Sequence, residues 1–374
     1  MTTQQTGPEE NHPLRVGIIG TGGIAHAHAG ALLQQEGIEL AVAIDVEPSR
    51  SEAFADKFAI GRTAVSLADA LNNGALDMVA VCTPPSSHQP LALEALSYGL
   101  HVVIEKPPAL SLRQMRELQH AEAASAGSVS CIFQHRFGSA AQRLVSLQSL
   151  GLLGKPLVGA CNTFWFRDQA YFDVPWRGRW DVEGGGPTMG HGIHQFDLLT
   201  HVWGPWAEVT AFASKLARQT DTEDVSAAIV RFESGAIATI TSSVISPRET
   251  SQLRLDYEFA TVELEHLYGY SNNNWSFTPA PGSEELRAAW ASDDDVASGH
   301  LAQYKAIVDA LSTGSPASVS LQDAYATMEL AAAIYASSLT GMPIERGQID
   351  EANPFYSRMD GHLEPWKQQE ASKA

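Results

Sequence analysis

Two basic side chains of this sequence are placed where they could move a proton. Lys106 directly follows the apolar run 101–104 and precedes two prolines, which is not the setting of an ordinary surface lysine. His194 lies on a segment with an apolar stripe at helical spacing, where a histidine is usually a packed core residue. A lysine with a lowered pKa can accept an alcohol proton near neutral pH, and a histidine can polarise the oxygen or relay the proton. Both residue types suit oxidation of a secondary alcohol.

A glycine-rich turn supplies the second chemical signal. Gly20-Thr21-Gly22-Gly23-Ile24-Ala25 stands between the apolar run 14–19 and a helical stretch, 24–35. Glycines at such a junction permit a tight turn and let the backbone approach a pyrophosphate at the helix N-terminus. The motif alone is weak, but its place in an N-terminal βαβ unit makes it specific. We therefore expect Gly20, Gly22, Gly23 and Ile24 to bind a dinucleotide.

The choice of dinucleotide depends on Asp45, at the end of the second apolar run, 38–44. A carboxylate there accepts hydrogen bonds from the adenosine ribose hydroxyls and repels a 2′-phosphate, which favours NAD over NADP. Arg50 lies five residues further on and could reach a 2′-phosphate. The predicted cofactor is NAD, with NADP as the alternative.

These residues need a scaffold of two domains. Residues 14–134 alternate apolar runs with helical stretches, the pattern of a Rossmann domain with a doubly wound parallel sheet. Residues 135–374 predict a C-terminal α/β domain for substrate binding and oligomerisation. There, one helix, an aromatic-rich region (164–180) and a helix near 191–203 precede several strands joined by turns, and two helices follow (301–311 and 321–339). This second pattern predicts a large, mostly antiparallel open sheet. Residues 1–13 are polar and acidic and predict a disordered tail.

Composition excludes several classes of partner. A formal charge of −19 argues against nucleic acid, which needs a basic footprint. No stretch reaches the roughly 18 apolar residues that a membrane span requires. The three cysteines, Cys82, Cys131 and Cys161, have no metal-like spacing and are typical of a reducing compartment. We therefore expect a soluble cytoplasmic protein.

Several further motifs occur in an order that resembles the Gfo/Idh/MocA family of oxidoreductases, which includes inositol dehydrogenases and glucose–fructose oxidoreductases. Their order and spacing carry the resemblance, which extends from about residue 14 to 339. The motifs are Thr83-Pro84-Pro85-Ser86-Ser87-His88, Glu105-Lys106-Pro107, Gln134-His135-Arg136-Phe137, Gly184-Gly185-Gly186 and Gly192-Ile193-His194-Gln195-Phe196-Asp197.

The resemblance implies a role for each matching position. Thr83, Pro84 and His88 would pass under the ribose and nicotinamide, and Glu105 would lie near the nicotinamide ribose. Lys106 matches the family's catalytic lysine, and His194 matches the histidine that pairs with it. Gln134 replaces an asparagine found in many members close to the nicotinamide. The residues expected to contact substrate are Arg136, Trp176, Arg177, His191 and His194.

One position departs from the family pattern. Many members carry aspartate four residues before the histidine, whereas this sequence has Gly190, followed by His191. Either His191 or solvent compensates, or the reaction differs from simple alcohol oxidation. His191 and His194 could also be interpreted as a metal pair on a helix, but no carboxylate or cysteine completes such a site, so we expect no metal.

An aromatic and arginine cluster precedes the triple glycine. Aromatic faces stack on sugar rings and arginines bind hydroxyls or carboxylates, but the same composition suits a domain or subunit interface. Its position favours Trp176 and Arg177 facing the cleft. The cluster consists of Trp165, Phe166, Arg167, Tyr171, Phe172, Trp176, Arg177, Arg179 and Trp180.

The function predicted from all this is an NAD-dependent dehydrogenase or reductase acting on a sugar, cyclitol or related polyol. Two alternatives remain: a glycoside hydrolase or lyase that uses NAD transiently, and a non-catalytic dinucleotide-binding sensor.

We also predict a cis Lys106–Pro107 peptide. A homodimer or homotetramer through the C-terminal sheet is expected, because strands such as 237–240 are apolar on both faces.

Overall fold

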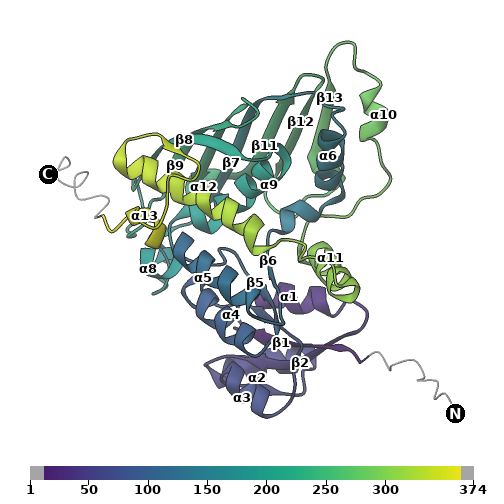
Figure 1. The fold of residues 1–374 in the computed structure, drawn as a ribbon, viewed down its shortest axis with the longest axis vertical. Helices are drawn as coiled ribbons and strands as arrows, with labels where there is room; N and C mark the ends of the chain where they lie inside the picture. The colour runs from purple at the N-terminus through teal and green to yellow at the C-terminus, as the bar shows by residue number, and fades with distance from the viewer. Residues whose placement is uncertain (1–11, 364–374) are drawn as a thin grey trace.

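The computed structural model describes residues 12–363, and most of the predicted N-terminal tail lies outside this range. The N-terminal part contains a six-stranded sheet of order β3-β2-β1-β4-β5-β6, in which all neighbouring strands are parallel (Figure 1). This is the predicted doubly wound Rossmann sheet. Its strands are β1 (Leu14–Ile19), β2 (Ile38–Ile44), β3 (Thr63–Ala64), β4 (Met78–Val81), β5 (His101–Ile104) and β6 (Val129–Cys131).

Helices connect successive strands of this sheet. The apolar runs of β1, β4 and β5 are buried because helices cover both faces, as parallel sheets require. Two short elements, β3 and α3, lacked a periodic signal and were not predicted. The helices are α1 (Ala25–Leu32), α2 (Pro48–Phe58), α3 (Leu67–Asn72), α4 (His88–Ser97) and α5 (Leu112–Ala123).

The C-terminal part is built on an eight-stranded sheet of order β13-β12-β11-β7-β10-β9-β8-β14. Only the β10–β7 pair is parallel, so the prediction of a large, mostly antiparallel sheet is confirmed. Its strands are β7 (Pro156–Phe166), β8 (Trp206–Ser214), β9 (Val225–Phe232), β10 (Ile237–Ser243), β11 (Ile245–Tyr257), β12 (Ala260–His266), β13 (Trp275–Pro279) and β14 (Ile344–Glu345).

Helices cover one face of this sheet. Helix α9 (Ile193–Trp203) packs against β7, and α12 (Leu321–Thr340) packs against β8. The opposite face exposes large apolar side chains from four adjacent strands, namely Val158, Phe212, Ile229 and Ile237. Burial of this face against a second subunit stays a prediction.

The C-terminal part also reaches back onto the Rossmann part. Helix α11 (His300–Thr313) packs on α1, and α12 packs on α5 (Figure 1). The N-terminal and C-terminal parts are therefore held together by helix packing as well as by the chain connection that follows β6. Helix α11 brings His300 and Tyr304 toward the Rossmann part, which the site depends on.

One smaller expectation agrees with the structure. The Lys106–Pro107 peptide is cis, as predicted. The three cysteines are buried and free. Within the part of the chain from 12 to 363, no helix combines the length and apolar character of a membrane crossing.

Candidate active site

A cavity of about 1090 Å³ runs between the two parts of the molecule. It begins at the glycine-rich turn, passes the ends of β4 and β5, and reaches the aromatic cluster after β7. Parallel sheets bind ligands at this carboxyl edge of their strands. One continuous cavity therefore contains both the predicted dinucleotide-binding residues and several of the predicted substrate-binding residues.

The glycine-rich turn has the backbone that a dinucleotide needs. Gly20 has a φ of +84°, and a Cβ there would lie 2.6 Å from Cγ2 of Thr83. Any larger residue at position 20 would therefore be strained and would collide with the next strand end. Gly22, Gly23 and Ile24 line the cavity, and a Cβ on either of these glycines would meet no protein atom within 4 Å. The backbone at 22 and 23 is thus open to a ligand.

Asp45 lies at the same end of the cavity and is held as a carboxylate. Its Oδ2 accepts from the backbone N of Thr21 at 2.9 Å and from the Thr21 hydroxyl at 2.8 Å. Burial alone would raise the pKa of Asp45, but these bonds and one from the Glu47 amide outweigh it and lower the pKa. Arg50 also lines this end.

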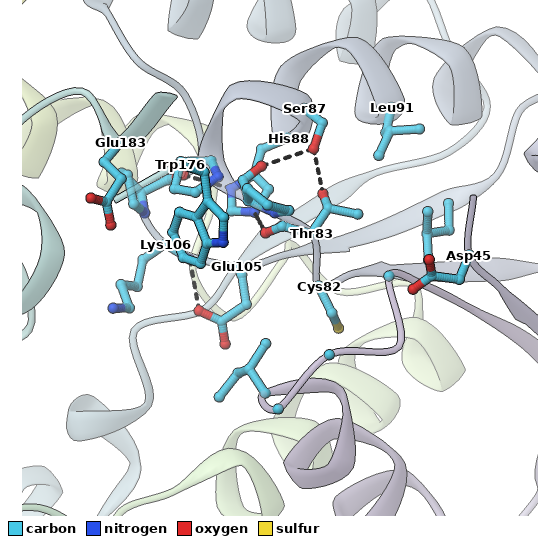
Figure 2. Close-up of a pocket in the computed structure, with 18 of the residues that line it drawn as sticks. Asp45, Cys82, Thr83, Ser87, His88, Leu91, Glu105, Lys106, Trp176 and Glu183 are labelled. Atoms are coloured by element: carbon cyan, nitrogen blue, oxygen red, sulfur yellow. Dashed lines mark hydrogen bonds between the residues drawn. The ribbon is translucent and has the colours of Figure 1, made fainter. Parts of the chain in front are cut away.

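His88 fixes the segment that follows β4. Its Nδ1 lies 2.8 Å from the Pro107 carbonyl oxygen and its Nε2 lies 2.7 Å from the Thr83 carbonyl oxygen (Figure 2). The ring therefore ties the turn at 83–88 to the turn at 106–107. Thr83, Pro84 and His88 all line the cavity.

Lys106 stands at the middle of the cavity. Its Nζ donates to the Gly190 carbonyl oxygen at 2.8 Å, and its backbone N donates to Oε2 of Glu105 at 3.0 Å. Burial lowers the pKa of the Lys106 amine, against the opposing charge of Glu105. The amine is thus disposed to lose a proton more readily than an exposed lysine.

Gly190 leaves space beside that amine. A Cβ at position 190 would meet nothing within 4 Å. Gly190 belongs to a π-helical turn, Thr188–Gly192, that leads into α9. Such turns are frequent at functional sites, and here the turn presents a backbone carbonyl to Lys106 in place of a carboxylate.

His191 and His194 line the same cavity. Burial and the charge of Lys106 hold the pKa of both rings well below the ordinary histidine value, so both are neutral at physiological pH. The Nδ1 atom of each is buried without a protein hydrogen-bond partner. A buried polar atom of this kind normally has a partner, which makes both rings candidates for binding a ligand.

The far end of the cavity is aromatic. The Arg177 guanidinium lies 4.0 Å from the ring centres of both Trp176 and Tyr171, and its Nη1 lies 3.3 Å from Oε1 of Glu183. The His191 ring lies 4.8 Å from that of Trp165. Figure 2 shows Trp176 and Glu183 on the Lys106 side of the cavity and Asp45 on the other. Sugar rings and their hydroxyls suit such a surface of ring faces and charged groups.

The structure places two predicted residues away from the cavity surface. Arg136 makes two hydrogen bonds to Asp197, at 2.8 and 2.6 Å, so its guanidinium is used in a buried ion pair instead of facing substrate. Gln134 is buried and donates to the Tyr268 hydroxyl, and Tyr268 itself lines the cavity.

Four residues of the site were not singled out from the sequence for a chemical role. Glu183 and Tyr268 line the cavity, and His28 and His300 both contact Glu105. His28 is fully buried. Glu183 precedes the triple glycine and carries no pattern of its own. His300 and Tyr268 lie far along the chain, so only the fold brings them to the site.

Comparison with known proteins places these features in a family. The family model "Oxidoreductase family, NAD-binding Rossmann fold" matches residues 14–133, and the "GFO/IDH/MocA C-terminal domain" matches residues 141–283. The chain is 28% identical over 357 residues to D-glucoside 3-dehydrogenase of Escherichia coli, covering 89% of this chain and 97% of that protein. It is 24% identical over 355 residues to D-apiose dehydrogenase of Paraburkholderia graminis, covering 90% and 91%.

Solved structures show the same fold. The WlbA dehydrogenase from Bordetella pertussis, in complex with NADH and UDP-GlcNAcA, superposes with a TM-score of 0.80 at 24% identity, covering 90% of this chain and 99% of that chain. Levoglucosan dehydrogenase in complex with NADH gives a TM-score of 0.77 at 18% identity, covering 90% and 100%.

Proposed function

Because the chain belongs to the Gfo/Idh/MocA family of NAD-binding oxidoreductases, we propose that it transfers a hydride between NAD and a secondary alcohol of a sugar, cyclitol or related polyol. One observation carries the proposal. The Lys106 amine, with its lowered pKa, lies in the same cavity as the glycine-rich turn and the aromatic cluster. Cofactor, base and a sugar-binding surface thus meet in one continuous space.

The residues present fit NAD. The backbone at Gly22 and Gly23 is open toward the cavity, and the ionised Asp45 lies beside it. Gly22, Gly23 and Ile24 would hold the pyrophosphate, Asp45 the adenosine ribose, and Thr83 and Glu105 the nicotinamide half. When bound, NAD supplies the hydride acceptor. Asp45 supports NAD over NADP, whereas Arg50, which also lines the cavity, would favour the phosphate.

Lys106 acts as the general base or acid for the alcohol proton. Its neutral amine accepts the hydroxyl proton as the hydride leaves, and in the reverse direction its ammonium returns it. The Gly190 carbonyl orients the amine through the hydrogen bond at 2.8 Å. The neutral imidazole of His194, which lines the cavity, donates to or accepts from the reacting oxygen.

The substrate end supports a ring-shaped polyol. The rings of Trp176, Tyr171 and Trp165 offer faces for the C–H surface of a pyranose, while Arg177 and Glu183 bind hydroxyls. The two curated relatives described above are named for a glucoside and for apiose. The open space beside Gly190 adds room next to the reacting carbon, so a substituted sugar such as a glycoside fits the proposal.

That open space also favours a second candidate. The Lys106 amine donates to a carbonyl and not to a carboxylate. In this second candidate, oxidation is a transient step: the substrate is oxidised, eliminates its leaving group or adds water, and is reduced again with no net change in NAD. Retention of both Lys106 and His194 argues against a non-catalytic sensor.

A substrate panel tests the proposal. Sugars, cyclitols and glycosides are each mixed with enzyme and either NAD or NADP, and both the nicotinamide absorbance and the products are followed. Net NADH formation with a keto-sugar product supports the dehydrogenase. Substrate cleavage without net NADH supports the transient reaction, and no turnover with any compound on the panel would contradict both.

A further inference from the structure

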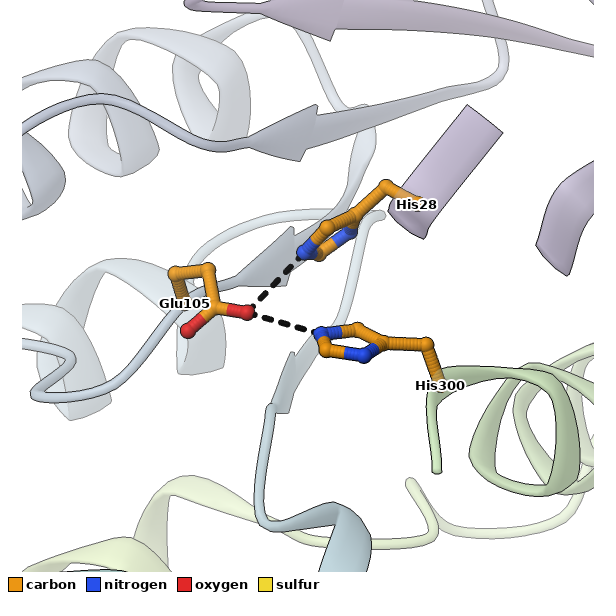
Figure 3. A group of neighbouring side chains, drawn as sticks. All are labelled: His28, Glu105 and His300. Carbon is orange, nitrogen blue, oxygen red and sulfur yellow. Dashed lines mark hydrogen bonds and ion pairs between the residues drawn. The ribbon is translucent and has the colours of Figure 1, made fainter. Parts of the chain in front are cut away.

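A buried cluster at the wall of the cavity contains one carboxylate between two helices that are far apart in the sequence. Oε1 of Glu105 lies 3.0 Å from Nε2 of His28, on α1, and 2.9 Å from Nε2 of His300, on α11 (Figure 3). The exposed fractions of the three side chains are 0% for His28, 6% for Glu105 and 7% for His300. Among residues 12–363, this is the only group of three His, Cys, Asp or Glu side chains whose possible metal-ligand atoms all lie within 4.8 Å of one another.

The hydrogen bonds give the cluster a consistent protonation state. The Tyr304 hydroxyl lies 2.7 Å from Nδ1 of His28. If that hydroxyl donates, His28 is the neutral tautomer with its proton on Nε2, and it donates to Glu105. His300 donates to the same oxygen, and the Lys106 backbone N donates to the other one. The carboxylate therefore accepts three hydrogen bonds without any metal ion.

These bonds keep Glu105 charged although it is buried. Burial alone would raise its pKa, but the bonds from His28 and His300 outweigh burial and hold the pKa well below the ordinary glutamate value. Glu105 lines the cavity directly beside Lys106. A nicotinamide ring that exchanges a hydride with a substrate bound at Lys106 must therefore lie close enough to Glu105 to interact with its negative charge.

We infer that His28 and His300 are positioning residues that keep Glu105 ionised, so that its charge favours the cationic oxidised nicotinamide over the neutral reduced ring. The inference rests on NAD being the cofactor, as proposed above. It assigns the C-terminal helix α11 a part in cofactor preference, because both His300 and the hydroxyl that orients His28 come from that helix.

Other titratable groups surround Glu105 and are shared by all the variants compared below. They come from the ends of β4 and β5 and from the helices and loop packed around them. These groups are Cys82, His88, Lys106, His194, Tyr268 and Tyr304.

The test measures dissociation constants of NAD⁺ and NADH by calorimetry from about pH 9 to about pH 6, the range in which a perturbed carboxyl group can titrate. In the native protein Glu105 remains ionised over this range, so any change in the ratio of the two constants comes from groups that the variants share, such as Lys106, and serves as the baseline. The double variant His28→Leu, His300→Leu removes both donors and leaves the burial. Compared with the native protein, its preference for NAD⁺ should weaken by at least about tenfold as the pH falls. Two unit charges about 12 Å apart at an effective dielectric of about 20 already interact by about 1.4 kcal/mol, the equivalent of tenfold, and closer charges interact more strongly.

Matched variants separate charge from packing. Glutamine places an N–H near the position of the histidine Nε2, so His28→Gln, His300→Gln should restore the native pH dependence of the ratio. Glu105→Gln should lack the NAD⁺ preference at every pH. ADP-ribose, which lacks the nicotinamide ring, should bind the native protein and all variants about equally, which excludes misfolding.

Three outcomes would overturn the inference: a ratio in the leucine variant that depends on pH as it does in the native protein, a Glu105→Gln variant that keeps the NAD⁺ preference, or a stoichiometric metal ion that is lost with His300→Leu. If the native protein binds ADP-ribose but neither NAD⁺ nor NADH, the proposed function fails as well. Binding of both cofactors with no pH effect in the variant beyond that of the native protein refutes this inference alone.

Discussion

Replacing Lys106 with alanine should lower turnover by about 10²–10⁴-fold, the usual contribution of a general acid–base group. The structure explains why no neighbour replaces it. The Lys106 Nζ lies 2.8 Å from the Gly190 carbonyl oxygen, which carries no proton to exchange, and the nearby His191 and His194 rings have pKa values well below the ordinary range. At ~1.4 kcal/mol for each tenfold, the loss corresponds to about 3–5 kcal/mol of transition-state stabilisation.

The assay should separate chemistry from binding. Steady-state kcat is measured with saturating substrate and NAD, and NAD affinity is measured by calorimetry. Because the glycine-rich turn and Asp45 are distant from the amine along the cavity, NAD affinity should change only a few-fold. Lys305→Ala, at an exposed lysine that pairs with Asp309, serves as the matched control and should leave kcat unchanged.

The pH profile provides a second readout. Oxidation requires the neutral amine, and burial lowers the pKa of Lys106 from its ordinary value. The native rate of oxidation should therefore fall as pH drops below that lowered pKa, and this limb should disappear in the residual activity of Lys106→Ala. A variant with near-native kcat and an unchanged profile would refute the assignment of Lys106 as the group that accepts the alcohol proton.

Three further predictions follow from the same geometry. His191→Ala should raise KM by up to about tenfold with a smaller effect on kcat, because the His191 ring lines the cavity and can contact the substrate there. A fall in kcat alone would contradict this. Asp45→Ala should narrow the preference for NAD over NADP by about tenfold or more, measured by calorimetry, since it removes the charge that repels a 2′-phosphate; an unchanged preference would contradict the role of Asp45. Phe212 is 77% exposed on the open sheet face, and Phe212→Glu should shift the protein from oligomers to monomers, as measured by light scattering. A native protein that is already monomeric would refute the predicted interface.

The sequence was most informative where local pattern decides structure. The apolar runs of β1, β2 and β5 and the glycines at 20–23 have strong local signals, so the Rossmann sheet was predicted nearly strand by strand. Strand β7 (Pro156–Phe166) was not predicted, although it is central in the second sheet. Its alternating burial is obscured by small residues at its start and by the aromatic and arginine residues at its end, which indicated a binding loop.

Residues whose roles depend on distant partners could not be assigned in the same way. Arg136 stands in a motif next to the predicted site, but its partner Asp197 lies 61 positions along the chain, and only the fold brings the two together. The same holds for His300, which is 195 positions from Glu105. Pairings of this kind require knowledge of how α9 and α11 pack, which periodicity does not contain.

Gly190 gives the departure from the family pattern a chemical interpretation. A carboxylate at this position would stabilise the Lys106 ammonium and raise its pKa, whereas the carbonyl that the π-helical turn presents offers an acceptor without a full charge. The hydrogen bond to the carbonyl therefore holds the amine in place and raises its pKa less than an ion pair with a carboxylate would. On this reasoning, loss of the aspartate does not disable the lysine as a base. It leaves the neutral form more populated near physiological pH and opens the space beside it to a substituent of the substrate.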